Sequence, residues 1–399
     1  MLSSIRAKLD NLSLSLGLTD IDPDEFNVQL KLPPEIHIDP PLLNSANPWA
    51  TTLEDLKALF ECPSTGAVTT RTALLDGFAH HPGTHQYTFF NPSTNLPGGR
   101  VSARQSASPE EGANASLNNM GYSPIRLDEY LGYIQEISDA LPGPSEKWII
   151  VSVAGTPDDV FTCYLRVWRL QAEVKMPLAL ELNLSCPNIP GAPPPAYDAE
   201  ALGKHLDMLR AASASVRAGA AAVGEDRGTR SVPWGVKTPP YTHAGQFEML
   251  VAALKGVAAP RFREACPASF VTATNTLGSC LVLEDEDGGG ADEKGRRPRL
   301  AGSGVGGMAG AALHPLALGN VATLRRMLDA GRETRHVRVV GVGGVEDAAG
   351  YRRMRDVGAA AVGVGTALGR NGVGVFGEIA EGLRKVKVGS AGDGKGVEW

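Results

Sequence analysis

The chain has 399 residues, of which 43% are hydrophobic and 21% are charged, as is usual for a globular protein. Its formal net charge of −6 argues against broad nucleic-acid binding, because that function requires a basic surface. Five scattered cysteines without a CxxC pair argue against a disulfide framework and favour a reducing compartment. We expect a cytoplasmic protein without nucleic-acid or membrane partners, since the sequence has no apolar run of about 18 residues.

Residues 1–39 are interpreted as an N-terminal extension. The segment has no apolar core typical of a secretory signal and soon becomes acidic. Arg6 and Lys8, together with several serines, leave a mitochondrial presequence as the weaker alternative.

Short apolar runs alternate with helix-like stretches along the chain. The strand candidates are residues 41–46, 66–72, 148–155, 178–185, 234–239, 269–275, 337–343 and 359–365. The helix candidates are residues 52–60, 157–173, 198–222, 245–257, 317–330, 346–356 and 374–387, with Asp198 as an N-cap. Eight strand–helix units with strands that are apolar on both faces predict an α/β fold, a single-domain (β/α)8 TIM barrel over residues 40–387.

Two segments interrupt the alternation. Residues 76–117 are rich in Gly, Pro, His, Asn and Ser and are predicted to be an inserted loop region. Residues 284–303 are charged and rich in glycine, which is typical of a flexible surface loop. Residues 388–399 are expected to form a disordered tail.

Polar residues follow several predicted strands, where barrel enzymes place their reactive groups. In ELNLSCPNIPG (181–191) an apolar strand ends at Asn183, and Pro187 prevents regular continuation. A lone cysteine is usually inert and buried, but the flanking amides make Cys186 a candidate reactive residue. Lys237 ends another strand, where a lysine is costly unless paired; the alternative is a side chain that reaches the rim.

Glycine motifs end the last two predicted strands, at GVGG (341–344) and VGVGT (362–366). Each alone is compatible with a simple tight turn. Together they place backbone N–H groups beside one point, which suits a phosphate. No GxGxxG fingerprint follows the first strand, so FMN is favoured over NAD. The eight histidines form no HExxH motif or cluster, and we assign no metal.

These motifs, taken in order, resemble the dihydroorotate dehydrogenases, specifically the soluble class that carries cysteine at the active site and uses fumarate. The resemblance spans about residues 40–387. The matching segments are NPWATTLEDLKAL, LNNMG, ELNLSCPNIPG, GVKTPPY, ATNTLG, GVGGVED and VGVGTAL. Their collinearity is more specific than any one motif.

The resemblance implies FMN-dependent oxidation of (S)-dihydroorotate to orotate in de novo pyrimidine (UMP) biosynthesis. Hydride would pass from C6 to flavin N5 while Cys186 removes the C5 proton as general base; fumarate would be the acceptor and the protein a homodimer. The implied substrate-binding residues are Asn118, Met120, Gly121, Asn183, Asn188, Asn275 and Thr276. The implied cofactor-binding residues are Ser45, Arg71, Thr72, Asn183, Lys237, Thr274, Gly307, Gly343, Gly344, Gly365 and Thr366, with Lys237 supporting the N1/O2 edge of the flavin.

The chain departs from the family pattern near the substrate. Arg71 stands where the family usually has lysine, Asn47 replaces a glycine, and Ser123 and Pro124 replace Pro–Asn. Two alternatives therefore stay open. One is a related flavin barrel that acts on another reduced pyrimidine or on dihydrouridine in RNA; the other is a degenerate paralogue that binds FMN without turnover.

Overall fold

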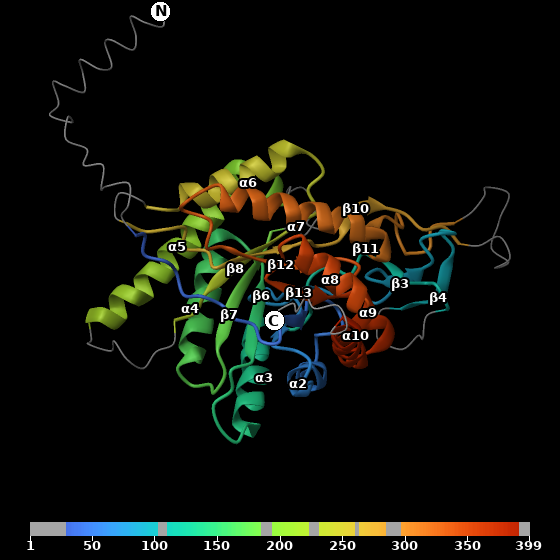
Figure 1. Ribbon diagram of the computed structural model, residues 1–399, viewed down its shortest axis with the longest axis horizontal. Coiled ribbons are helices and arrows are strands. Elements are labelled where there is room, and N and C mark those ends of the chain that lie inside the picture. The colour runs from blue at the N-terminus through green and yellow to red at the C-terminus, as the bar shows by residue number, and fades with distance from the viewer. Residues whose placement is uncertain are drawn as a thin grey trace, which may run out of the picture.

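The computed structural model describes residues 29–102, 110–184, 194–222, 231–259, 263–284 and 297–390. Within these ranges eight parallel strands close into a barrel, in the order β1-β13-β12-β9-β8-β7-β6-β2 (Figure 1). The strands are β1 (Leu42–Asn44), β2 (Ala67–Thr69), β6 (Trp148–Val153), β7 (Leu178–Asn183), β8 (Trp234–Thr238), β9 (Phe270–Ala273), β12 (Arg338–Val342) and β13 (Ala361–Val364). Each lies within a predicted strand, and the prediction of a (β/α)8 barrel is confirmed.

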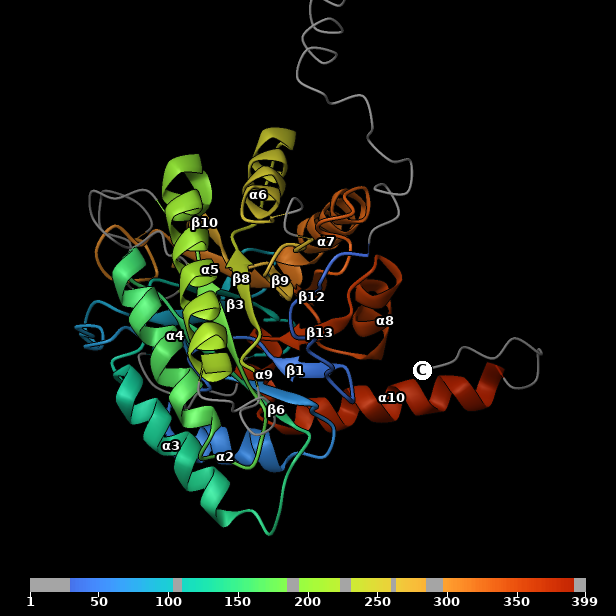
Figure 2. The same ribbon diagram turned by 90° about the vertical axis from the view of Figure 1, so that its left-hand side faces the viewer.

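Helices surround the strands of the barrel (Figure 2). Those that match predicted ranges are α2 (Leu53–Glu61), α4 (Pro157–Gln171), α5 (Ala199–Ala222), α6 (Ala244–Gly256), α7 (His314–Asp329), α8 (Ala348–Asp356) and α10 (Gly374–Ser390). Asp198 caps α5, since its Oδ1 accepts a hydrogen bond of 2.7 Å from the Ala201 N–H.

Two further helices were not predicted, α3 (Leu127–Ala140) and α9 (Thr366–Asn371). The pattern of α3 was nevertheless visible in the sequence. Leu127, Tyr130, Ile134 and Ile137 are buried and recur at the three- and four-residue spacing of one helix face. Acidic residues in its first turn also favour a helix N-terminus.

A second, antiparallel sheet lies beside the barrel, in the order β10-β11-β5-β3-β4 (Figure 1). Its strands are β3 (Tyr87–Phe90), β4 (Pro97–Ser102), β5 (Ala115–Asn118), β10 (Leu277–Cys280) and β11 (Gly306–Gly310). The predicted inserted loop, residues 76–117, therefore contains ordered strands. The sheet escaped prediction because β5 pairs with β11, a segment far away in the sequence.

Aromatic packing joins the second sheet to the barrel. The Trp49 ring, on the segment after β1, lies 5.2 Å from the Tyr87 ring edge-to-face and 5.9 Å from the Phe89 ring in a stacked arrangement. Such pairs contribute about 0.5–1.5 kcal/mol beyond their area burial. The sheet is thereby held over the segment that follows β1.

The barrel interior is apolar toward the amino ends of the strands. One buried cluster contains Ile36, Ile38, Leu43, Ala67, Ile150, Ala179, Phe270, Val340, Val342 and Ala361. Phe270 is fully buried, and Gly235 on the neighbouring strand β8 makes room for its ring. A Cβ atom at Gly235 would lie 2.4 Å from the Phe270 carbonyl oxygen and 2.5 Å from its ring.

We predict that Gly235→Ala lowers the free energy of unfolding by about 1–3 kcal/mol, because the added methyl group overpacks the barrel. Gly132→Ala is the matched control: Gly132 lies within α3 and a Cβ there meets nothing within 4 Å. That change should stabilise the protein by up to about 1 kcal/mol. Urea unfolding of both variants measures the difference, and equal effects would contradict this account of the packing.

Candidate active site

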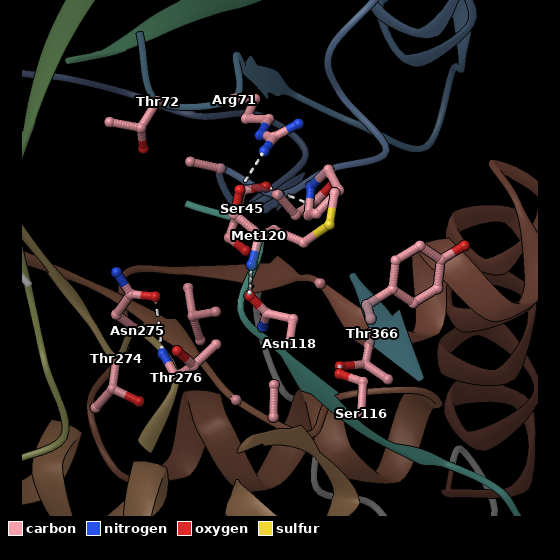
Figure 3. A pocket seen from close by; sticks show the side chains of 18 of the residues that line it. Ser45, Arg71, Thr72, Ser116, Asn118, Met120, Thr274, Asn275, Thr276 and Thr366 are labelled. Carbon is pink, nitrogen blue, oxygen red and sulfur yellow. Dashed lines mark hydrogen bonds between the residues drawn. The ribbon is translucent and has the colours of Figure 1, made fainter. Parts of the chain in front are cut away.

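A cavity lies where the strands of the barrel end. The centres of water-sized molecules can occupy about 140 Å3 of it. Residues at or just after the ends of β1, β2, β7, β8, β9, β12 and β13 line it from the barrel. Residues of β5 and of the segment that follows β5 line it from the second sheet. In Figure 3, Arg71 and Thr366 lie at opposite ends of the group of side chains.

Most of the predicted site residues line this one cavity. They are Ser45, Arg71, Thr72, Asn118, Met120, Gly121, Asn183, Lys237, Thr274, Asn275, Thr276, Gly343, Gly344, Gly365 and Thr366. Cys186 and Asn188 lie outside the described residues. The structure therefore brings together residues that are more than 300 positions apart in sequence, such as Ser45 and Thr366.

Gly307 does not line the cavity. It lies within β11 and pairs with Asn118 of β5. A Cβ atom at Gly307 would lie 2.1 Å from the Thr276 hydroxyl oxygen, so this glycine makes room for a neighbouring side chain. The glycine of β11 that lines the cavity is Gly310, which has a φ of 80°.

Sequence reasoning did not assign several lining residues to the site: Trp49, Tyr87, Ser116, Tyr122 and Gly310. Trp49 lies within the quoted NPWATT segment, so a signal for it existed. Tyr87 and Ser116 belong to the second sheet, and their place at the cavity could not be inferred before that sheet was recognised.

Lys237 places a buried cation at the cavity. Its side chain is 2% exposed, and its Nζ donates a hydrogen bond of 3.2 Å to the Ala46 carbonyl oxygen. Burial lowers the pKa of Lys237, and the negative charge of nearby Glu181 acts in the opposite direction. The lysine is therefore paired inside the barrel and does not extend to the rim.

Arg71 supplies a second buried cation. Its Nη2 donates to the carbonyl oxygens of Met120, Gly121 and Tyr122, at 3.3, 3.3 and 2.8 Å. Burial lowers the pKa of Arg71 to about 10, which still leaves the guanidinium charged at neutral pH. This residue thus ties the segment after β5 to the barrel and brings positive charge to the cavity.

Side-chain amides form a connected group on the barrel side. The Asn183 Nδ2 donates to the Thr72 hydroxyl oxygen at 3.0 Å, and the Asn275 Nδ2 donates to the Asn183 Oδ1 at 3.1 Å. The Thr276 backbone N–H then donates to the Asn275 Oδ1 at 2.8 Å (Figure 3). Such amides can recognise a polar ring by complementary hydrogen bonds.

The other end of the cavity is lined by glycines. Gly343 and Gly344 have φ values of 137° and 68°, which favour glycine. The Gly343 carbonyl oxygen lies 2.7 Å from the His314 Nδ1, and both Gly343 and Gly344 line the cavity. Backbone N–H groups of such glycine turns can bind an anion.

Among the residues that the structure describes, no three His, Cys, Asp or Glu side chains are grouped so that they could hold a metal ion. None of the helices described is both long and apolar enough to cross a membrane.

The fold and the site define a (β/α)8-barrel protein with a ligand cavity. Two buried cations, several side-chain amides and several glycines line this cavity. The family model for dihydroorotate dehydrogenase matches residues 105–386, which is more than half of the chain. The chain belongs to the dihydroorotate dehydrogenase family, whose members are oxidoreductases that act on CH–CH groups. The predicted family and enzyme class are confirmed.

Similar proteins agree with this assignment. The dihydroorotate dehydrogenase (fumarate) of Trypanosoma cruzi is 29% identical over 348 residues, which cover 87% of this chain and 89% of that protein. A probable dihydroorotate dehydrogenase A (fumarate) of Streptococcus pneumoniae is 27% identical, with the same coverage. The dihydroorotate dehydrogenase A (fumarate) of Lactococcus lactis subsp. lactis is 28% identical over 271 residues, which cover 68% of this chain and 73% of that protein.

Solved structures share the fold. The ligand-free DHODH of Eimeria tenella has a TM-score of 0.61 at 16% identity, covering 94% of this chain and 91% of that one. The same enzyme in complex with ferulenol has a TM-score of 0.60 at 17% identity, covering 88% and 82%. At this level of identity the likeness concerns the fold alone.

Proposed function

We propose that this protein oxidises (S)-dihydroorotate to orotate in de novo pyrimidine (UMP) biosynthesis, with FMN as its cofactor. The observation that carries the proposal is the convergence of Arg71, Lys237 and the amides of Asn183 and Asn275 on one cavity with a glycine-lined end. Family membership supplies the reaction type, and the cavity offers groups suited to a planar, anionic, hydrogen-bonding ligand.

The residues at the cavity fit FMN. The Thr274 hydroxyl oxygen and the Trp49 indole nitrogen are buried without a hydrogen-bond partner among the described residues, and both residues line the cavity. Buried polar groups normally have partners, so these two support the presence of a ligand in this space. The backbone near Gly343 and Gly344 adds donors suited to a phosphate.

We assign the cofactor to the residues predicted for it that line the cavity: Ser45, Arg71, Thr72, Asn183, Lys237, Thr274, Gly343, Gly344, Gly365 and Thr366. When bound, FMN would supply the acceptor for the hydride that leaves the substrate. Lys237 would provide a fixed positive charge beside it, which favours negative charge that develops there. Gly307 is left out of this set because β11 and the Thr276 side chain surround it.

The substrate would lie against Asn118, Met120, Gly121, Asn183, Asn275 and Thr276, with Asn188 assigned from the resemblance. Arg71 would pair with the substrate carboxylate, since a guanidinium binds carboxylates in a planar, charge-assisted geometry. Cys186, which follows β7 in the sequence, would remove the C5 proton as general base. The active form would be its thiolate, because the thiol itself is a poor base.

Finer features of the proposal come from the relatives and from the family resemblance. Fumarate as the electron acceptor is supported by the names of the Trypanosoma cruzi and Streptococcus pneumoniae relatives. A homodimer and a cytoplasmic location follow from the resemblance of the motifs to the soluble class.

The central test is reduction of the bound flavin. Purified protein should be yellow and should lose its flavin absorbance when dihydroorotate is added without oxygen. Cys186→Ala should still bind FMN but react at least about a hundredfold more slowly, the scale of lost general-base catalysis. Cys62→Ala is the control, since Cys62 does not line the cavity and should behave as wild type.

Stopped-flow absorbance measures these rates, and dihydrouracil and dihydrothymine are tested beside dihydroorotate. A yellow protein that no substrate bleaches would overturn the proposal in favour of a protein that binds FMN without turnover. Faster bleaching by dihydrouracil would assign a different pyrimidine.

Thr274→Val tests the fit of the cofactor. Because the hydroxyl is unpartnered in the structure, its removal should leave the stability of the FMN-free protein unchanged or raise it by about 1 kcal/mol. FMN affinity should fall about tenfold, the loss expected for one hydrogen bond. Flavin fluorescence titration and urea unfolding measure the two effects. Unchanged FMN affinity would show that this hydroxyl does not contact the cofactor.

Arg71 predicts the pH dependence of substrate binding. Because its folded-state pKa is about 10, the guanidinium is charged at pH 7–9 and the dissociation constant of dihydroorotate should be constant there. As pH rises through about 10 the charge is lost, and affinity should weaken about 10- to 100-fold, as for a charge-assisted hydrogen bond. The measurement uses flavin absorbance in Cys186→Ala, in which turnover is slow. If the same step persists after Arg71→Gln, another group is responsible.

A further inference from the structure

A carboxylate that the proposed reaction does not use is buried beneath the cavity. Glu181 belongs to β7 and is 2% exposed. Its Oε1 accepts a hydrogen bond of 3.0 Å from the Ser152 hydroxyl, and its Oε2 accepts one of 2.7 Å from the Thr272 hydroxyl. Burial of a charge is energetically unfavourable, so a charged residue inside the barrel suggests a functional role.

Glu181 is the end of a chain of hydrogen bonds that leads to the cavity. Ser152 lies 3.0 Å from the Thr72 hydroxyl oxygen. Thr72 in turn accepts from Asn183, and Asn183 accepts from Asn275. Thr72, Asn183 and Asn275 line the cavity, whereas Ser152 and Glu181 are buried below it.

The chemistry of the carboxylate gives this chain one direction. A carboxylate only accepts hydrogen bonds, and a hydroxyl has a single proton. Ser152 donates its proton to Glu181, so toward Thr72 it must accept. Thr72 therefore donates to Ser152 and must accept from its other neighbour, the Asn183 side chain.

Each asparagine side chain has two possible orientations, which exchange the positions of its NH2 group and its carbonyl oxygen, and the direction of the chain of hydrogen bonds selects one of them. Asn183 must turn its NH2 group toward Thr72, which leaves its carbonyl oxygen facing Asn275. Asn275 must then turn its NH2 group toward Asn183 and its oxygen toward the Thr276 N–H, which can only donate. The two ends of the chain, a carboxylate and a backbone N–H, thus demand the same orientations.

We propose that Glu181 is a positioning residue that acts together with the Thr276 N–H to hold the side-chain amides of Asn183 and Asn275 in one orientation. Glu181, which lies below the cavity, would then determine which donors and acceptors these amides present to a planar ligand. The negative charge of Glu181 also acts on Lys237, where it opposes the effect of burial on the pKa of the lysine. The effect on substrate rests on the proposed function, whereas the orientation itself does not.

The test compares two variants that each remove one hydrogen bond to Glu181. Ser152→Ala breaks the chain between Glu181 and the amides. Thr272→Val removes the other hydroxyl and leaves the chain intact, so it controls for the general cost of losing a buried hydrogen bond. Both residues are buried and lie in barrel strands, which makes the pair well matched. Both are made in the full-length protein as purified.

The direct readout is the NMR signals of asparagine side-chain amides in protein made with isotope-labelled asparagine. The signals of Asn183 and Asn275 are identified by their loss in Asn183→Asp and Asn275→Asp. Ser152→Ala should shift these signals or split them into two sets, whereas Thr272→Val should leave them in place. Glu181→Gln should also shift them, since a carboxamide offers a donor as well as an acceptor and so weakens the preference for one direction.

The functional readout is binding of orotate. Its dissociation constant should rise about tenfold in Ser152→Ala and stay within about twofold in Thr272→Val, with KM for dihydroorotate rising more than kcat falls. Equal effects of the two variants, or no effect of Ser152→Ala on the amide signals, would overturn the proposal. If wild-type protein binds no orotate, the proposed function fails, and the amide signals still decide the orientation.

Discussion

Partnering of the buried charges is the constraint on which this structure depends. A carboxylate, an ammonium and a guanidinium lie in or beneath the cavity, and Glu181, Lys237 and Arg71 are 2%, 2% and 6% exposed. Removal of such ions from water costs several kcal/mol each. Glu181 accepts hydrogen bonds from two hydroxyls, Lys237 donates one to the Ala46 carbonyl oxygen, and Arg71 donates to three carbonyl oxygens. The barrel tolerates these charges because each has partners, and they give the cavity its chemistry.

The two-residue period of the strands arranges these groups in levels. On β9, Phe270 belongs to the apolar cluster, Thr272 bonds to Glu181, and Thr274, just past the strand, lines the cavity. On β7 the same levels are filled by Ala179, Glu181 and Asn183. Alternate residues of a strand face the same side, so these two strands each contribute an apolar residue, a polar support and a ligand-facing group. A polar residue in the middle level can therefore orient a side chain in the level that lines the cavity.

The sequence was sufficient to predict the barrel and most residues of its cavity. Apolar runs of the right length predicted all eight barrel strands, and polar residues at their ends, such as Lys237 and Asn275, do line one cavity. Glu181 was not singled out, because nothing local indicates which hydroxyls of β6 and β9 would face it. The second sheet was missed for a related reason, since the pairing of β5 with β11 joins distant segments. Gly307 was misplaced because glycines that contact a ligand and glycines that admit a neighbouring side chain look alike in sequence.

Arg71 and Ser123, two of the expected departures from the family pattern, belong to one contact network. Arg71 donates to the Met120–Tyr122 segment, and the next residue, Ser123, shares a hydrogen bond of 2.8 Å with the Tyr130 hydroxyl. Burial raises the pKa of Tyr130 to about 12, while Ser123 and the charge of Arg71 act against this rise. Ser123 also donates its backbone N–H to the Thr72 carbonyl oxygen at 2.8 Å.

Random loss of function would be expected to leave such a segment without partners. Here the arginine and the serine hold the same segment to the barrel and to α3. The guanidinium carries positive charge in a planar group that makes several hydrogen bonds at once. This segment of the cavity wall is therefore anchored at several points, which favours a working site over a degenerate one.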